Sequence, residues 1–229
     1  MTPSIDQIGH GIRRCRRCER SQTRLHAVPG AGNPSARVLL LGEAPGKTED
    51  KMGAPFVGRT GRYLDSVLKK YGISRESLYI TSVLKCFHPD PPTDEQIEAC
   101  QPWTASQIDA LSPAAILVMG RWAARSLFKI DRLGTAKLDR TWRCIPCVVT
   151  SHPTAAMRFP ERAKQFRRDI RRVMAITGAT GRPRDRRSAT GAAGRNAGEP
   201  NAPERKGLEQ KAPERTAPER TAPERTGRA

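Results

Sequence analysis

The sequence VLLLGEAPG, residues 38–46, gives the strongest indication of the fold. Its first four residues form an uninterrupted apolar run, which is typical of a strand buried on both faces of a parallel sheet. The glycines and the proline that follow place a turn at the carboxyl end of this strand, where open α/β sheets bind their ligands. With Glu43 in this turn and Phe56 in GAPFVG (residues 53–58), the loop offers backbone N–H donors, a carboxylate and an aromatic face. These groups suit the binding of a flat ring with carbonyl oxygens. The same residues fit equally well a structure in which Glu43 is a solvated turn residue and Phe56 packs in the core.

The rest of the chain alternates apolar runs with amphipathic segments. Three further strands are expected at residues 78–84, 114–119 and 145–150. Helices are expected at residues 1–14, 59–71, 93–111, 120–128 and 160–176. This alternation predicts an α/β fold, a three-layer α/β/α sandwich around a central, mostly parallel four-stranded sheet. Because Glu43, Phe56, Ser82 and His152 all fall at strand ends, we expect them to converge on one site.

Composition limits the classes of function. The chain has 41 Lys and Arg against 23 Asp and Glu, a formal charge of +18, which favours an anionic polymer as partner. No apolar stretch approaches the roughly 20 residues of a membrane span, and the N-terminus lacks the apolar segment of a signal peptide. A soluble, cytoplasmic protein without a membrane partner is therefore expected. Six cysteines in such a protein favour metal or cluster ligation over a disulfide framework.

The composition changes abruptly at about residue 177. From there the chain is rich in Gly, Ala, Pro, Arg and Glu, and it repeats APERT at residues 212–216, 217–221 and 222–226. A segment of this kind cannot bury a core, so residues 177–229 are expected to be a disordered basic tail on a domain of residues 1–176. The tail has 12 basic and 7 acidic residues, which leaves 29 and 16 in the domain. Most of the excess positive charge therefore belongs to the folded part.

Three motifs together resemble the family 4 uracil-DNA glycosylases, the iron-sulfur branch of that superfamily. They are GEAPG (residues 42–46), Glu49-Asp50 and GAPFVGRTG (residues 53–61), and the resemblance extends over about residues 10–172. It implies a monofunctional DNA glycosylase that hydrolyses the N-glycosidic bond of uracil, or of another deaminated base, to begin base excision repair. It also implies a monomer that is associated with the nucleoid through its DNA binding.

The resemblance assigns roles at matching positions. Phe56 would stack on the flipped base, and backbone amides around Gly42, Glu43 and Ala44 would bind its carbonyl oxygens. Glu43 would position the attacking water. His152, in SHPT (residues 151–154), would donate a hydrogen bond to the oxygen that gains negative charge. On sequence alone, His152 could equally cap the end of a strand.

Three further positions concern base choice and DNA contact. Ser82 stands where the family usually has Asn, whose amide reads the edge of uracil, so recognition of the base is expected to differ here. Met157 would act as a wedge in the minor groove, and Arg158 as a phosphate or groove contact. The Gly42 loop could instead bind phosphate in a nucleotide-handling enzyme, but Glu43 would repel phosphate and no Gly-Lys-Ser/Thr follows. A non-catalytic nucleic-acid-binding protein that retains the glycosylase fold is a second alternative.

The cysteines fall into two groups. Cys15, Cys18, Cys86 and Cys100 occupy the positions where the resembled family ligates a [4Fe-4S] cluster, although four thiolates are chemically as well suited to tetrahedral zinc. Cys144 and Cys147 form a second Cys-x2-Cys pair. They could join the N-terminal pair in a site of zinc-ribbon type, or serve as small apolar residues at the start of a strand.

Overall fold

The computed structural model describes residues 2–130, 133 and 138–178. All of these lie within one compact unit, Met1–Asp185. The expected tail at residues 177–229 lies outside the described residues apart from Thr177 and Gly178. No helix in the described part of the chain is both long enough and apolar enough to cross a membrane.

The sheet has six strands in the order β1-β3-β2-β4-β6-β5. Their bounds are Ala31–Gly32 (β1), Val38–Gly42 (β2), Tyr79–Ser82 (β3), Ala115–Met119 (β4), Leu138–Trp142 (β5) and Ile145–Thr150 (β6). The four expected strands form the parallel centre, β3-β2-β4-β6. The predicted number of four strands is wrong, because β1 and β5 add an antiparallel strand at each edge. The class, a mostly parallel α/β/α sandwich, is confirmed.

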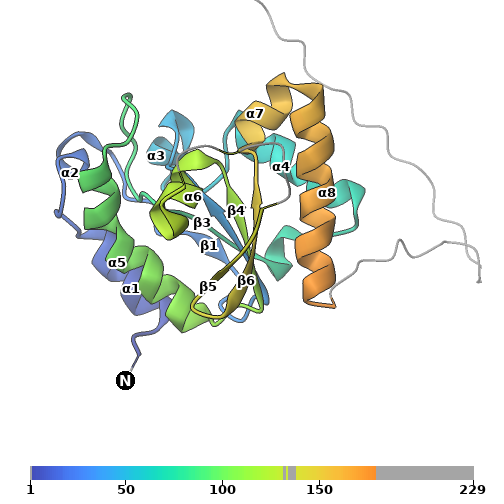
Figure 1. Ribbon diagram of the computed structural model, residues 1–229. Coiled ribbons are helices and arrows are strands. Elements are labelled where there is room, and N and C mark those ends of the chain that lie inside the picture. Colours follow the sequence, from blue (N-terminus) through green and yellow to red (C-terminus); the bar gives the residue numbers. More distant parts are fainter. Residues whose placement is uncertain (1, 131–132, 134–137, 179–229) are drawn as a thin grey trace, which may run out of the picture. The chain divides into compact units, whose positions relative to one another are not determined.

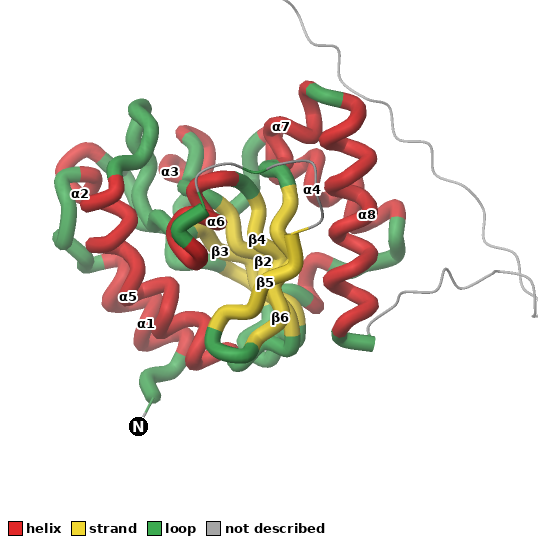
Figure 2. The backbone as a smooth tube through the Cα atoms, in the orientation of Figure 1, coloured by secondary structure: helices red, strands yellow, loops and turns green. Residues whose placement is uncertain are grey.

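Helices cover both faces of the sheet because its central strands are apolar on both sides. Val38 and Leu40 point into one core cluster, whereas Leu39 and Leu41 point into the other. The first cluster is covered by α4 (Arg59–Lys70) and α8 (Pro160–Ile176), and the second by α5 (Asp94–Leu111) and α6 (Arg121–Phe128). Figures 1 and 2 show α4 and α8 on one side of the sheet and α5 and α6 on the other.

The remaining helical elements in the described part of the chain have nine residues or fewer. They are α1 (Ile5–Arg13), α2 (Arg20–Thr23), α3 (Lys47–Met52), the 3₁₀ turn η1 (Arg75–Ser77) and α7 (Pro153–Arg158). The first helix begins at Ile5 because Ser4 caps it: the Ser4 hydroxyl accepts from the backbone N–H of Gln7, and the Gln7 side chain accepts in return from that of Ser4. Helix α1 packs against α5 on the outside of the sandwich. In this position α1 and α2 bring the N-terminal cysteines to the segment that follows β3.

Candidate active site

A pocket of about 140 Å³ opens at the carboxyl ends of β2, β3 and β6. A cavity of about 150 Å³ is enough to hold a benzene ring, so this pocket, which we call the base pocket, suits one small ring. Phe56, Ser82 and His152 line it, as their places at strand ends predict, together with Ala44. The remaining lining residues are Val28, Pro45, Gly46, Glu49, Pro55, Thr60 and Thr154.

Phe56 has a left-handed backbone conformation, with φ of 52°, and a buried side chain. Its ring fills the space beside Gly42, where a Cβ atom would lie only 2.6 Å from the Phe56 Cζ atom. Gly42 is therefore needed at the end of β2 for close packing of this ring. The ring centroids of Phe56 and His152 lie 6.2 Å apart. The strained turn thus presents an aromatic side chain to the pocket from a fixed position.

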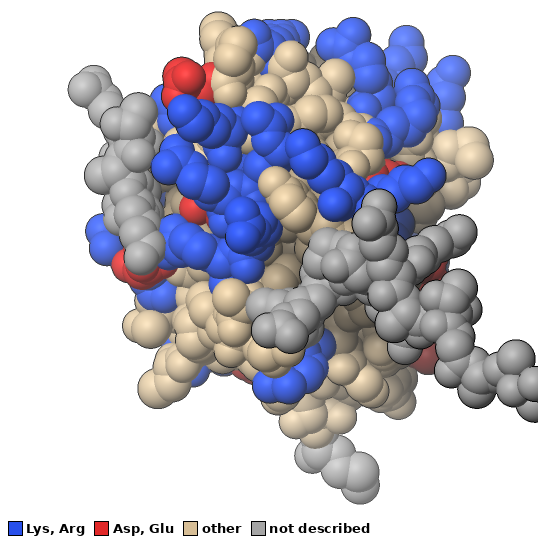
Figure 3. Space-filling model, turned by 90° about the vertical axis from the view of Figure 1, so that its right-hand side faces the viewer, with Lys and Arg blue, Asp and Glu red and all other residues tan. Residues whose placement is uncertain are grey.

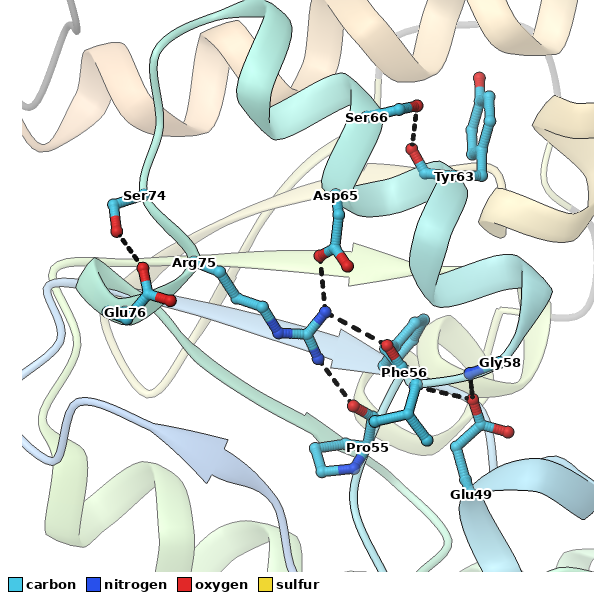
Figure 4. A network of polar contacts seen from close by, with 11 residues as sticks. Glu49, Pro55, Phe56, Gly58, Tyr63, Asp65, Ser66, Ser74, Arg75 and Glu76 are labelled. Atoms are coloured by element: carbon cyan, nitrogen blue, oxygen red, sulfur yellow. Dashed lines mark hydrogen bonds and ion pairs between the residues drawn. The ribbon is translucent and has the colours of Figure 1, made fainter. Parts of the chain in front are cut away.

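Two charged side chains hold this turn in place, as Figure 4 shows. Glu49 accepts hydrogen bonds from the backbone N–H groups of Val57 (3.0 Å) and Gly58 (2.8 Å). Arg75 donates to the carbonyl oxygens of Pro55 (2.7 Å) and Phe56 (3.2 Å), and it forms an ion pair with Asp65. Sequence reasoning did not find the role of Arg75, which lies 19 residues beyond Phe56. The motif pair Glu49-Asp50 was the only signal for Glu49.

His152 is the N-cap of α7, and its ring is oriented by Thr154. The backbone N–H of Thr154 donates to His152 Nδ1 at 3.3 Å, so the proton of the neutral ring lies on Nε2. Burial lowers the pKa of His152 to about 4, and the nearby Glu49 carboxylate acts in the opposite direction. The ring is therefore neutral at pH 7. It is equipped to donate one hydrogen bond from Nε2.

Glu43 points away from the base pocket into a neighbouring cavity. This cavity, the side hollow, has a volume of about 280 Å³ and is also lined by Arg20, His88, residues 89–92, Arg121 and Trp122. Ala44 and His152 line both the base pocket and the side hollow. Gly120 has φ of 97°, and a Cβ atom there would lie 2.2 Å from Glu43 Oε1. The carboxyl group therefore packs directly against Gly120, the N-cap of α6.

The surroundings of Glu43 change its acidity. Burial raises the pKa of Glu43 to about 7, against the opposing effects of the backbone N–H groups of Trp122 and Arg121 and of the Arg121 charge. A carboxyl group with this pKa can exchange a proton near neutral pH. Pockets that hold such groups are candidates for acid–base chemistry.

Ser82 ends β3 directly beside Gly42 of β2. Beneath it lies Lys85, whose side chain is only 1% exposed. The Lys85 ammonium group donates to the backbone oxygen of Ser82, to Thr81 Oγ1 (3.0 Å) and to Gln107 Oε1 (2.7 Å). Desolvation lowers the pKa of Lys85 to about 8. Nothing in the sequence indicated a role for this lysine. Its hydrogen bonds connect Ser82, which lines the base pocket, to the segment that carries Cys86.

Met157 and Arg158 lie in the last turn of α7, a helix that sequence analysis did not predict. Arg158 is exposed and Met157 is partly exposed. The first turn of α7 faces inward, since the Thr154 hydroxyl contacts that of Thr60 at 3.1 Å. The helix thus connects the base pocket to the surface beside it.

Cys86 and Cys100 lie within electrostatic reach of the N-terminal cysteines. Cys15 and Cys18 act on the Cys86 thiol, and Cys86 and Cys18 act on the Cys100 thiol. Burial raises the pKa of Cys86 and raises that of Cys100 to about 11. Within residues 2–130, 133 and 138–178, no three Cys, His, Asp or Glu side chains are close enough to form the site of one metal ion.

Two of these thiols accept hydrogen bonds from side-chain nitrogen donors. Arg24 Nη1 donates to Cys86 Sγ at 2.8 Å, and the indole N–H of Trp103 donates to Cys15 Sγ at 3.1 Å. Hydrogen bonds to sulfur are among the features that tune protein-bound iron-sulfur clusters. The donor set therefore fits thiolate ligation of a cluster.

The second Cys-x2-Cys pair is placed differently. Cys144 is exposed, with φ of 67°, in the turn between β5 and β6, whereas Cys147 is buried in β6 and donates to the carbonyl oxygen of Ile145 at 3.4 Å. Cys147 packs in the cluster between the sheet and α5 and α6. Cys147 thus has the position of a small apolar residue, and Cys144 does not.

Comparison with known families shows that the α/β fold is that of the uracil-DNA glycosylase class. The family described as the Uracil DNA glycosylase superfamily matches residues 29–174. A type-4 uracil-DNA glycosylase of Archaeoglobus fulgidus is 34% identical over 187 residues, covering 76% of this chain and 94% of the relative. The chain is also similar to two other type-4 uracil-DNA glycosylases. The enzyme of Saccharolobus solfataricus is 34% identical, with 74% of this chain and 85% of the relative covered. The enzyme of Thermotoga maritima is 33% identical, with 72% of this chain and 88% of the relative covered.

The chain belongs to the type-4 uracil-DNA glycosylases. It is accordingly a DNA glycosylase, a DNA-repair hydrolase of N-glycosidic bonds whose macromolecular partner is DNA.

Proposed function

We propose that this protein removes uracil from DNA and thereby begins base excision repair. The observation that carries the proposal is the base pocket, where Phe56, Ser82 and the neutral His152 meet at the ends of three parallel strands. A base inside a duplex is hidden by stacking and pairing, so the target nucleotide must be flipped out to reach such a pocket. The Phe56 ring then stacks on the flipped base.

His152 stabilises the leaving base. As the N-glycosidic bond breaks, its electron pair passes to the uracil ring and negative charge gathers on a carbonyl oxygen. The Nε2–H of His152 donates to this oxygen, because Nδ1 is already occupied as an acceptor from Thr154. A donor fixed in a desolvated site typically contributes about a hundred- to a thousandfold to the rate.

Glu43 acts from the side hollow. The deoxyribose lies at the boundary of the two cavities, which Ala44 and His152 share. The ionised carboxyl group of Glu43 positions a water and accepts its proton as the water oxygen bonds to the sugar carbon. The products are free uracil, which takes up a proton, and an abasic site.

Cys15, Cys18, Cys86 and Cys100 would hold a [4Fe-4S] cluster, with zinc as the less favoured alternative. When bound, such a group supplies a structural crosslink, and excision requires no redox chemistry on the base. Arg24 bridges the Cys86 thiol and, at 2.8 Å, the backbone oxygen of Cys15, which supports this set over a zinc ribbon made with Cys144 and Cys147.

The exposed end of α7 faces the DNA in this proposal. Met157 enters the minor groove beside the flipped nucleotide, and Arg158 contacts a phosphate or the groove edge. Their place at the end of the helix that His152 begins supports this role, since one short rigid element then joins groove contact to base contact.

Single-turnover excision tests the proposal. The full-length protein is incubated with a duplex that holds one uracil, and abasic sites are then revealed by heat and alkali. We expect cleavage at uracil, a loss of about a hundred- to a thousandfold for His152→Gln, and no change for the control His10→Gln, whose side chain is exposed on α1. Tight binding without excision of any base would instead identify a non-catalytic DNA-binding protein.

Ser82 extends the proposal to other deaminated bases. Its hydroxyl is shorter than an Asn amide and offers a single group for reading the base, so we infer weaker discrimination among bases. Parallel assays on uracil, hypoxanthine and xanthine duplexes, with the wild type and Ser82→Asn, examine this inference. Ser82→Asn should excise uracil faster and the purines more slowly. An unchanged preference would show that Ser82 does not read the base.

A further inference from the structure

The outer faces of α4 and α8 carry basic residues at regular helical spacing. The exposed positions of α4 include 59, 62, 69 and 70, and those of α8 include 164, 168 and 171. Positions three, four or seven apart lie on the same side of a helix, so each helix presents one basic stripe. We call this surface the α4–α8 face; it consists of Arg59, Arg62, Lys69, Lys70, Lys164, Arg168 and Arg171.

Two ring contacts place α4 and α8 next to each other. The rings of Tyr63 and Phe166 lie 6.1 Å apart near the middle of the helices. Further along both, the Arg171 guanidinium lies 5.8 Å from the ring of Tyr71, which follows α4. Figure 3 shows Lys and Arg side chains gathered on this side of the molecule, with few acidic ones among them.

The basic residues of the α4–α8 face differ from those on the opposite side in their ion pairing: two acidic residues of the same helices, Asp65 and Asp169, pair with Arg75 and Arg172 instead. In the described part of the chain, none of the seven forms an ion pair. On the α5 side, by contrast, Arg125 pairs with Asp94, Lys129 with Glu98 and Arg143 with Asp109. Uncompensated like charges at this density are costly unless an anionic partner neutralises them.

The α4–α8 face extends away from the base pocket. Helix α8 has 17 residues, so it is about 25 Å long. It runs from α7, beside the pocket, along the sheet to the opposite end of the strands (Figure 1). A duplex whose base enters the pocket lies across the strand ends. To follow α8 as well, it would have to bend sharply, at a cost of about 1–6 kcal/mol for bends of 40–90°.

We propose that the α4–α8 face binds the phosphate backbone of a second duplex DNA segment while the first occupies the pocket end. This goes beyond excision, and it rests on the proposed function only in taking DNA as the substrate. Long-range attraction to phosphate is independent of sequence and releases counterions, which suits a surface that binds undamaged DNA. The consequence is direct transfer of the enzyme from one DNA segment to another during its search for a damaged base.

Transfer is measured with undamaged DNA. The full-length protein is bound to a labelled duplex, and its dissociation is followed at increasing concentrations of the same duplex without label. The test variant is Lys69→Gln/Arg168→Gln/Arg171→Gln. The matched control is Arg125→Gln/Lys129→Gln/Arg143→Gln, which loses the same charge from ion-paired positions. The C-terminal segment is present in both.

We expect the dissociation rate of the wild type and of the control to rise with competitor concentration, because a second duplex binds before the first leaves. The rate of the test variant should not rise, and the slope of log Kobs against log salt should become shallower by up to about 2.7, at 0.9 per lost phosphate contact. Equal behaviour of the two variants, or a wild-type rate independent of competitor, would overturn the proposal.

Excision from a short uracil duplex separates this proposal from the proposed function. The test variant should cleave such a duplex as fast as the wild type, since a short duplex reaches only the pocket end. Slower cleavage would mean that the face grips the damaged duplex itself, which also overturns the proposal. If the wild type failed to excise uracil at all, the proposed function would fall, whereas the transfer result on undamaged DNA would stand.

Discussion

The acidity of Glu43 makes the pH dependence of excision a direct test of its role as the group that positions water. The pKa of Glu43 is raised from 4.5 to about 7 by burial against Gly120. A carboxyl group with that pKa is about one-tenth ionised at pH 6 and about nine-tenths ionised at pH 8. Only the ionised form accepts a proton from water, so the excision rate should rise about tenfold between these values.

The assay is single-turnover excision between pH 6 and pH 8, so that product release does not limit the rate. His152 adds no step in this range because its pKa is lowered to about 4. Glu43→Gln should lower the rate by about a hundred- to ten-thousandfold and remove the pH dependence. The control Glu95→Gln changes an exposed carboxyl group of α5 and should keep the wild-type profile. A flat wild-type profile, or an unchanged slope in Glu43→Gln, would refute the assignment.

Three further predictions concern the turn, the cysteines and the C-terminal segment. Arg75→Met removes two hydrogen bonds to the turn that contains Phe56. The free energy of unfolding in urea should therefore fall by about 1–3 kcal/mol, and KM for the uracil duplex should rise. Unchanged values would show that the turn keeps its conformation without Arg75. Cys86→Ala should lose bound iron and soluble protein together, whereas Cys147→Ala should keep its iron; a brown, soluble Cys86→Ala protein would contradict the ligand assignment. Deleting residues 179–229 should weaken DNA binding and make its salt dependence shallower without abolishing excision at low salt; abolished excision would show that this segment takes part in the reaction.

The parallel centre of the sheet could be predicted because its strands are continuous apolar runs buried on both faces, such as residues 38–41. The edge strands could not. Strand β1 has only two residues, and β5 contains the charged pair Asp139-Arg140, so neither has a hydrophobic pattern of its own. Both strands form because a neighbouring strand offers unpaired backbone groups. Which strand is the neighbour cannot be read from the residues of β1 or β5 themselves.

The base pocket was predictable to the extent that strand ends bring residues together. Phe56, Ser82 and His152 meet there as expected. The direction of the Glu43 side chain was not predictable, since it depends on the space left by Gly120, a glycine 77 residues further along the chain. The role of Arg75 was not predictable either, because two of its partners are backbone oxygens, and every residue type has a backbone oxygen.

The two antiparallel edge strands have a consequence for self-association. The outer edges of β3 and β6 would otherwise expose rows of unpaired N–H and C=O groups, which template aggregation with other chains. Strand β1 covers one edge and is too short to recruit a neighbour, while β5 covers the other and bears exposed charges at Asp139 and Arg140. The two short or charged edge strands thereby protect the sheet against edge-to-edge pairing with other chains.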